Sequence, residues 1–162
     1  MLDTVFGLPT HALVVHLVVV LLPAAAAGSV LVALIPRLRG AYGWLVVAAA
    51  AMSAISVPVA THSGQHLFDR KSATFGPQQA AEAALMERHR TLAHELWPWV
   101  VLLLVGILAV MLLNRRAASW ARPAGYLAVV VTVVGAVATG IMVARIGHAG
   151  SQAVWGGLTG SR

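Results

Sequence analysis

The sequence contains no cysteine, and only 10% of its 162 residues are charged. The absence of cysteine excludes disulfide scaffolds, thiolate-held iron–sulfur clusters and any thiol nucleophile. A soluble domain has about 25% charged residues and about 45–50% apolar ones. This chain is 59% hydrophobic, with a mean hydropathy of +0.84. The composition therefore excludes a water-soluble globular domain, a disordered chain and a coiled coil.

Long apolar stretches make up most of the chain. A helix needs about 20 apolar residues to cross the hydrocarbon core of a bilayer. Four stretches meet this requirement, at residues 12–35, 41–61, 96–113 and 123–144. Each should be helical, because a span in lipid must satisfy its own backbone hydrogen bonds. The sequence predicts an all-α membrane protein whose four-transmembrane-helix bundle is one domain over residues 1–162.

The segment between the second and third spans, residues 62–95, is predicted to be a loop that contains a helix. Pro77 to Arg90 is rich in alanine and glutamate, and proline is favoured in the first turn of a helix. We expect this helix to continue into the third span and to project from the bilayer. No basic residue precedes the first span, and its apolar run is longer than that of a signal peptide, so we expect it to be retained.

The two sides of the predicted bundle differ in charge. The short loops 36–40 and 114–122 hold five arginines and no acidic residue. Arginine-dense short loops are typical of the cytoplasmic side. We therefore expect a multi-pass protein of the bacterial inner membrane with both termini outside the cytoplasm. On this interpretation the net charge of +6 reflects topology. The charges are too scattered for nucleic-acid binding.

Histidine is concentrated at one end of the predicted bundle. With four antiparallel spans, all seven histidines fall opposite the arginine-rich loops. They are His11, His16, His62, His66, His89, His94 and His148. Polar side chains are costly in a bilayer and there mark function, and neutral imidazole is the commonest metal ligand. We interpret this end as a cofactor or metal site, although a single interfacial histidine would be structural.

The helix rise predicts two layers of imidazoles, about 6–8 Å apart, with His148 near the surface. The inner layer is His16, His62 and His94. The outer layer is His11, His66 and His89. The two histidines that close the second span are four residues apart and share a helical face. Those that open the first and third spans are five apart and diverge by about 140°. We therefore expect one member of each such pair on a non-helical entry segment.

A short repeat relates the two halves of the chain. The first and third spans both open with two histidines five residues apart, at 11–16 and 89–94. The second span ends in Ala-Thr-His at 60–62, and the fourth passes Ala-Thr-Gly at 138–140. The pattern indicates two helical hairpins related by duplication. Parallel repeats pair about an axis along the membrane normal, with sites at their interface. Such an axis would bring the inner-layer histidines of the first and third spans together.

Other residues carry weaker signals. Glu95 adjoins a histidine at the membrane edge. Its carboxylate would either accept a hydrogen bond from a ligating imidazole, and so orient that ring, or simply face water. Trp97 lies at the boundary where an aromatic belt is expected. Gly106, Gly135 and Gly140 are expected to permit close helix packing.

The start of the chain resembles a known family. Residues 7–16 read Gly-Leu-Pro-Thr-His-Ala-Leu-Val-Val-His. They are similar to the G-x-P-x-H-P-x-x-V-H opening of the bacterial membrane family named domain of unknown function 2231. Ala12 stands where that family has proline, which should relax the helix entry. The Thr139-Gly140 step and His148 near the end are also similar, so the resemblance spans essentially the whole chain.

The resemblance implies about four spans and no settled activity. It also implies that some members are fused to Rieske-type or cytochrome c-type domains, which places the family near extracytoplasmic electron transfer. His11 and His16 correspond to the family's own histidines, whereas the other five depend on the topology argument.

Three functions are compatible with these patterns. The first is an electron-transfer protein that binds b-type haem, with His16 and His94 as the first axial pair and His62 next. It would exchange electrons with a quinol or a periplasmic redox protein. The second is a non-haem copper, zinc or iron protein that uses the seven histidines and Glu95. The third is a structural or pH-sensing membrane subunit. No hydrolase or transferase is expected. A homo-oligomer and a subunit of a larger complex are both compatible with the sequence.

Overall fold

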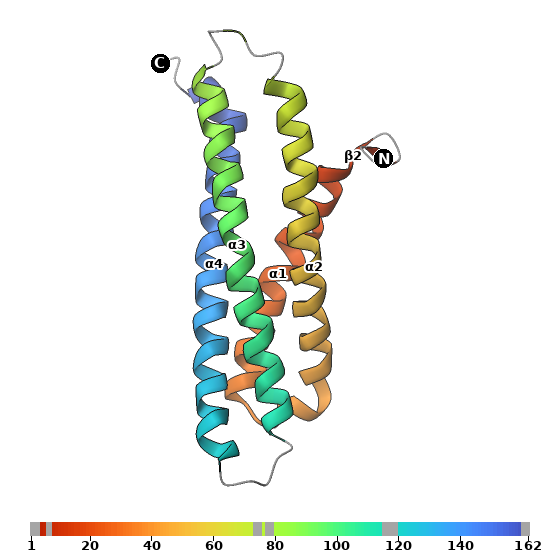
Figure 1. Cartoon of the computed structure of the whole chain (residues 1–162), viewed down its shortest axis with the longest axis vertical. Coiled ribbons are helices and arrows are strands. Elements are labelled where there is room, and N and C mark those ends of the chain that lie inside the picture. Colours follow the sequence, from red (N-terminus) through yellow and green to blue (C-terminus); the bar gives the residue numbers. More distant parts are fainter. Residues whose placement is uncertain (1–3, 6–7, 73–75, 77–79, 115–119, 160–162) are drawn as a thin grey trace.

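The computed structural model contains four long helices joined in antiparallel order (Figure 1). It describes residues 4–5, 8–72, 76, 80–114 and 120–159. The helices are α1 (Thr10–Leu34), α2 (Leu38–Ser72), α3 (Ala80–Leu113) and α4 (Ala121–Thr159). Two short antiparallel strands, β1 (Thr4–Val5) and β2 (Leu8–Pro9), precede α1.

All four helices are long and apolar enough to cross a membrane. The predicted all-α architecture and the four spans are therefore confirmed. The helical extension of the third span is also confirmed, because α3 runs unbroken from Ala80. Pro77, the predicted first-turn residue of that extension, lies outside the described residues.

Two helices extend further than predicted. Residues 62–72 are helical, not a loop, and α4 continues from 144 to Thr159. No proline lies between Pro58 and Ser72, and the single glycine there, Gly64, costs a helix only about 1 kcal/mol, so α2 continues where its apolar run ends. At a rise of about 1.5 Å per residue, the 35 residues of α2 extend about 52 Å. A hydrocarbon core of about 30 Å leaves the rest of that helix outside the lipid.

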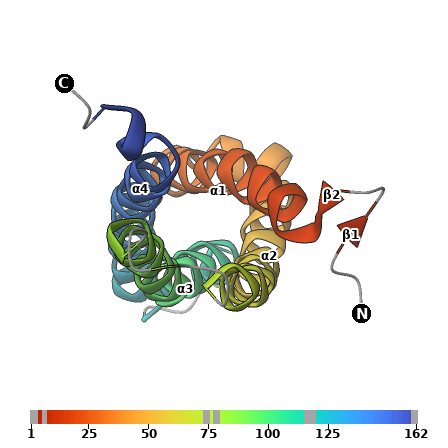
Figure 2. The ribbon, with the colours of Figure 1, turned by 90° about the horizontal axis from the view of Figure 1, so that it is seen from above.

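The helices form a ring in which each packs against its neighbours in sequence and α4 closes against α1 (Figure 2). The contact between α1 and α3, across the ring, is slight. One apolar cluster, around Leu22, Val57 and Val100, fills the half towards the histidines. A second, around Val32 and Ile107, fills the half towards the arginine-rich end.

Glycine permits the closest helix approach, between α3 and α4. A Cβ on Gly106 would lie 2.8 Å from the backbone nitrogen of Thr132, and one on Gly135 would lie 2.8 Å from that of Leu103. The predicted packing role is confirmed for these two glycines. It is wrong for Gly140, where a Cβ would meet nothing within 4 Å.

Proline inside α2 is compensated by a side chain of α3. Pro58 has no N–H, so the carbonyl of Ala54 four residues earlier lacks its usual helical donor. The indole Nε1 of Trp97 donates to that carbonyl at 3.1 Å. Trp97 therefore has a hydrogen-bonding role in addition to the membrane-boundary position that the sequence indicates.

Candidate functional site

The four helices enclose a cavity of about 520 Å³ in the half of the bundle that bears the histidines. Its walls are mostly apolar and come from all four helices, with Val18, Val57 and Val143 among them. Two imidazoles from helices that face each other across the ring, His11 on α1 and His89 on α3, also line it. We call these two residues the cavity histidines.

His11 lies in the first turn of α1 and is held by α2. Its Nδ1 lies 3.0 Å from the carbonyl oxygen of Ala60. A carbonyl can only accept, so Nδ1 carries the proton and donates, which leaves Nε2 of the neutral ring as a free acceptor. Gly64, one turn further along α2, packs against the same ring, because a Cβ there would lie 2.7 Å from His11 Cε1.

His89 is held by α4 in the same way. Its Nδ1 donates to the carbonyl oxygen of Ile146 at 3.1 Å. Gly150, again four residues after the carbonyl, packs against the ring, because a Cβ there would lie 3.1 Å from His89 Nδ1. A hydrogen bond from one ring nitrogen to a backbone carbonyl is the arrangement that orients ligating imidazoles in metal proteins.

The two half-sites correspond element by element. In each hairpin, a histidine in the N-terminal third of the first helix donates to a carbonyl of the second, and a glycine four residues after that carbonyl makes room for the ring. The duplicated-hairpin pattern in the sequence thus has a structural counterpart. The two histidines of these half-sites, His11 and His89, belong to the predicted outer layer, and His94 of the predicted inner layer also lines the cavity.

The predicted first axial pair, His16 and His94, is placed differently. His16 is exposed, does not line the cavity, and has its Nδ1 2.5 Å from the carbonyl of Ala12 in its own helix. His94 is exposed and lies at the cavity's edge. Each helix carries both of its opening histidines, so the expected non-helical entry segment is wrong. On α1 the divergence of about 140° leaves only His11 of the pair at the cavity, whereas on α3 both His89 and His94 line it.

The remaining histidines lie on other surfaces. His62, the predicted third haem ligand, and His66 are exposed on α2 outside the cavity, and His148 is exposed on α4. Across the described residues, no group of three or more histidine, aspartate or glutamate side chains is placed to hold a metal ion. The seven histidines and Glu95, which the sequence groups at one end of the bundle, occupy different helical faces in the structure.

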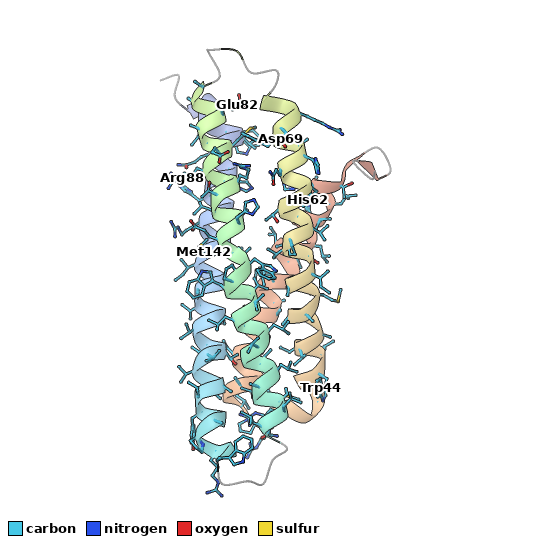
Figure 3. The ribbon with its side chains drawn as sticks, viewed as in Figure 1. Trp44, His62, Asp69, Glu82, Arg88 and Met142 are labelled. Carbon is cyan, nitrogen blue, oxygen red and sulfur yellow. The ribbon has the colours of Figure 1, made fainter. Side chains whose placement is uncertain are left out.

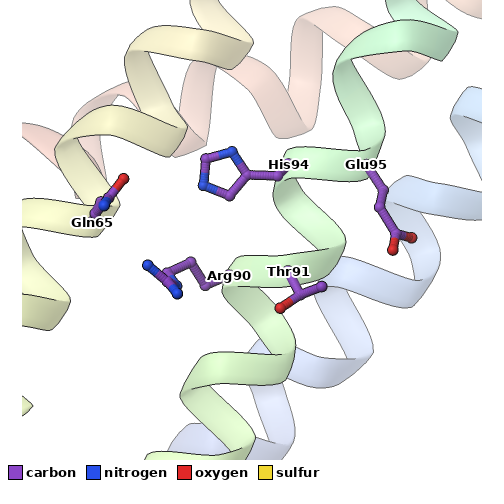
Figure 4. Close-up of a pocket in the computed structure, with 5 residues that line it drawn as sticks. All are labelled: Gln65, Arg90, Thr91, His94 and Glu95. Atoms are coloured by element: carbon purple, nitrogen blue, oxygen red, sulfur yellow. The ribbon is translucent and has the colours of Figure 1, made fainter.

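A polar mouth between α2 and α3 adjoins the cavity (Figure 4). Its lining residues are Gln65, Arg90, Thr91, His94 and Glu95. Arg90 and His94 also line the cavity, and both project from α3 towards α2, whereas Glu95 points away. The Arg90 guanidinium donates to Glu87 at 2.7 Å and lies 5.5 Å from the centre of the Phe68 ring.

A family model described as a predicted membrane protein, DUF2231, matches residues 7–161. The chain belongs to the DUF2231 family. No curated protein and no solved structure matches it. Membership agrees with the resemblance seen at the start of the sequence and with a multi-pass membrane protein, and the family description states no activity.

Sequence reasoning missed several residues that build the site in this DUF2231 protein. The carbonyls of Ala60 and Ile146 carry no side-chain signal, but Gly64 and Gly150 follow them at the same spacing of four. That repeated spacing was a readable sign of the half-sites. Arg90 carries no functional signal of its own in the sequence, and its position at the cavity follows from the continuation of α3.

Proposed function

We propose that this DUF2231 protein is a membrane cytochrome that holds one b-type haem in the interhelical cavity, with the cavity histidines as axial ligands. The observation that carries the proposal is the matched pair of half-sites. Each of His11 and His89 donates through Nδ1 to a backbone carbonyl, which leaves each Nε2 free to ligate. The two rings come from helices across the ring from each other and line one cavity.

The cavity suits a flat, mostly apolar group with carboxylates at its edge. Its volume of about 520 Å³ lies within the range of about 300–1,000 Å³ typical of cofactor sites. Its apolar walls match a porphyrin ring. Arg90 lies where the cavity meets the polar mouth, and a guanidinium is the side chain best suited to pair with carboxylates.

A haem bound there would supply one-electron redox chemistry. The chain's own residues do the rest. The carbonyls of Ala60 and Ile146 orient the two imidazoles, the apolar walls exclude water, and Arg90 offsets negative charge at the mouth. Histidine ligation and burial are the factors that set a haem potential. The electron partner would be a quinol or a periplasmic redox protein that approaches the mouth.

The orientation is part of the proposal. The arginine-rich loops favour the cytoplasmic side, so the histidine end would face away from the cytoplasm of a bacterial cell. A haem at that end alone would serve electron exchange at one membrane surface. The opposite half of the bundle has no histidine for a second haem, so transfer across the bilayer through two haems is not expected.

The test is an absorption spectrum of the detergent-purified protein, oxidised and then reduced, with metal analysis of the same sample. We expect a Soret band and sharp reduced α and β bands. His11→Ala and His89→Ala should each abolish them, whereas His16→Ala, on the exposed side of α1, should not. Stoichiometric copper, zinc or non-haem iron without a Soret band would refute the haem proposal and favour the metal-ion alternative. A protein supplied with haem and metals that holds neither would favour the structural or pH-sensing alternative.

A further inference from the structure

A second pair of imidazoles lies on α2, outside the cavity. His62 and His66 are one turn apart, and both are exposed. Their Nε2 atoms share a hydrogen bond of 3.2 Å, in which one ring donates and the other accepts, with ring centres at 4.7 Å and planes at 87°. We call them the α2 histidine pair. Neither residue lines the cavity or its mouth.

The spacing of the two nitrogens matches chelation of one ion. Zinc–imidazole bonds of about 2.0–2.1 Å in a tetrahedral site place two ligating nitrogens about 3.3 Å apart. The α2 histidine pair presents the same nitrogen, Nε2, from both rings at 3.2 Å. Histidines four residues apart on one helical face are also the arrangement that binds zinc in helical metal motifs.

The pair lies where a hydrated ion can reach it. The apolar part of α2 ends at residue 61, and the helix continues for eleven residues beyond that point. This extension carries Asp69 and Arg70, which are exposed. Figure 3 shows His62 and Asp69 on the same part of α2, far from Trp44 at the other end. The α2 histidine pair therefore follows the apolar part of the helix, where we expect the membrane surface.

We propose that the α2 histidine pair is a chelating site for a divalent transition-metal ion, separate from the haem site. Imidazole suits copper, zinc and nickel, and Cu²⁺ should bind most tightly in that series. Two protein ligands leave the other coordination positions to water or an incoming ligand. The site is therefore an exchangeable surface site and not a structural one, and it does not depend on the proposed haem.

The experiment is a Cu²⁺ titration of the full-length protein without a polyhistidine tag, followed by calorimetry and by electron paramagnetic resonance. We expect a site with two nitrogen ligands. His62→Ala and His66→Ala should each weaken it on the order of 10²-fold through loss of chelation. His148→Ala, which removes another exposed histidine on α4, is the matched control and should leave the site unchanged.

His62→Ala and His66→Ala replace exposed side chains, so both variants should fold. Circular dichroism and the elution volume in size-exclusion chromatography check this. His66→Gln provides a second, less drastic removal of the ligand. Tight Cu²⁺ binding that persists in both alanine variants, or a signal with one nitrogen in the unchanged protein, would overturn the proposal. His62→Ala should keep the haem spectrum, and His11→Ala should keep the copper site. The failure of either proposal is therefore distinguishable from the failure of the other.

Discussion

Gly64→Ala is the substitution that most directly tests how the cavity is built. A Cβ at this position would lie 2.7 Å from Cε1 and 2.9 Å from Nδ1 of His11. Carbon atoms pack at about 3.5–4.0 Å, so the imidazole must move by about 1 Å. Its hydrogen bond to Ala60 is 3.0 Å long. A shift of that size would take it past the usual limit of about 3.2 Å.

The expected loss is in cofactor affinity and not in the amount of folded protein. Loss of a hydrogen bond that orients a ligating histidine typically costs about 10–100-fold in affinity. Replacing glycine by alanine inside a helix gains about 1 kcal/mol, which offsets part of any destabilisation. Haem occupancy and the reduced spectrum, measured on equal amounts of folded protein, are therefore the appropriate assay.

Two related glycines calibrate the result. Gly150→Ala would place its Cβ 3.1 Å from Nδ1 of His89, which demands a smaller shift than Gly64→Ala. Gly140→Ala would meet nothing within 4 Å. We expect haem affinity to fall most in Gly64→Ala, less in Gly150→Ala and not at all in Gly140→Ala. If Gly64→Ala retains the affinity and spectrum of the unchanged protein, His11 is not held as an axial ligand by α2.

Three further expectations follow from the fold. Gly106→Ala should destabilise the bundle by about 1–3 kcal/mol, because its Cβ would press on the α4 backbone. Gly140→Ala should be neutral or slightly stabilising, because its Cβ would meet nothing within 4 Å. Thermal unfolding in detergent compares the two variants. Trp97→Phe should cost about 0.6 kcal/mol through loss of the bond to the free carbonyl. In a Pro58→Ala background, where the helix regains its own donor, that cost should disappear, and an unchanged cost would refute the compensation. The chain has no cysteine, so Asn114→Cys introduces a single thiol whose labelling reports the orientation of the protein. Asn114 lies at the arginine-rich end, which we expect on the cytoplasmic side, so an impermeant thiol reagent should label the variant only after the membrane is permeabilised.

The number of spans and the grouping of the histidines at one end could be predicted from the sequence. Both depend on hydropathy along the chain, which is a one-dimensional property. The extension of α3 was also predictable, because residues 77–90 have the composition of a solvated helix. The ends of α2 and α4 were not, because their extensions beyond residues 61 and 144 are not strongly apolar and contain glycines that weaken a helix, such as Gly64 and Gly147, but no proline that would end one.

The sequence by itself determined a four-span membrane bundle with its imidazoles at one end. Only the tertiary structure decided which imidazoles line one cavity. The spans are apolar on all sides, so no amphipathic stripe shows how each helix is rotated about its own axis. That rotation is set by packing between helices, where Gly64 and Gly150 admit the rings of His11 and His89. The same rotation turns His16 and His62 outwards, because side chains on one helix cannot all face one neighbour.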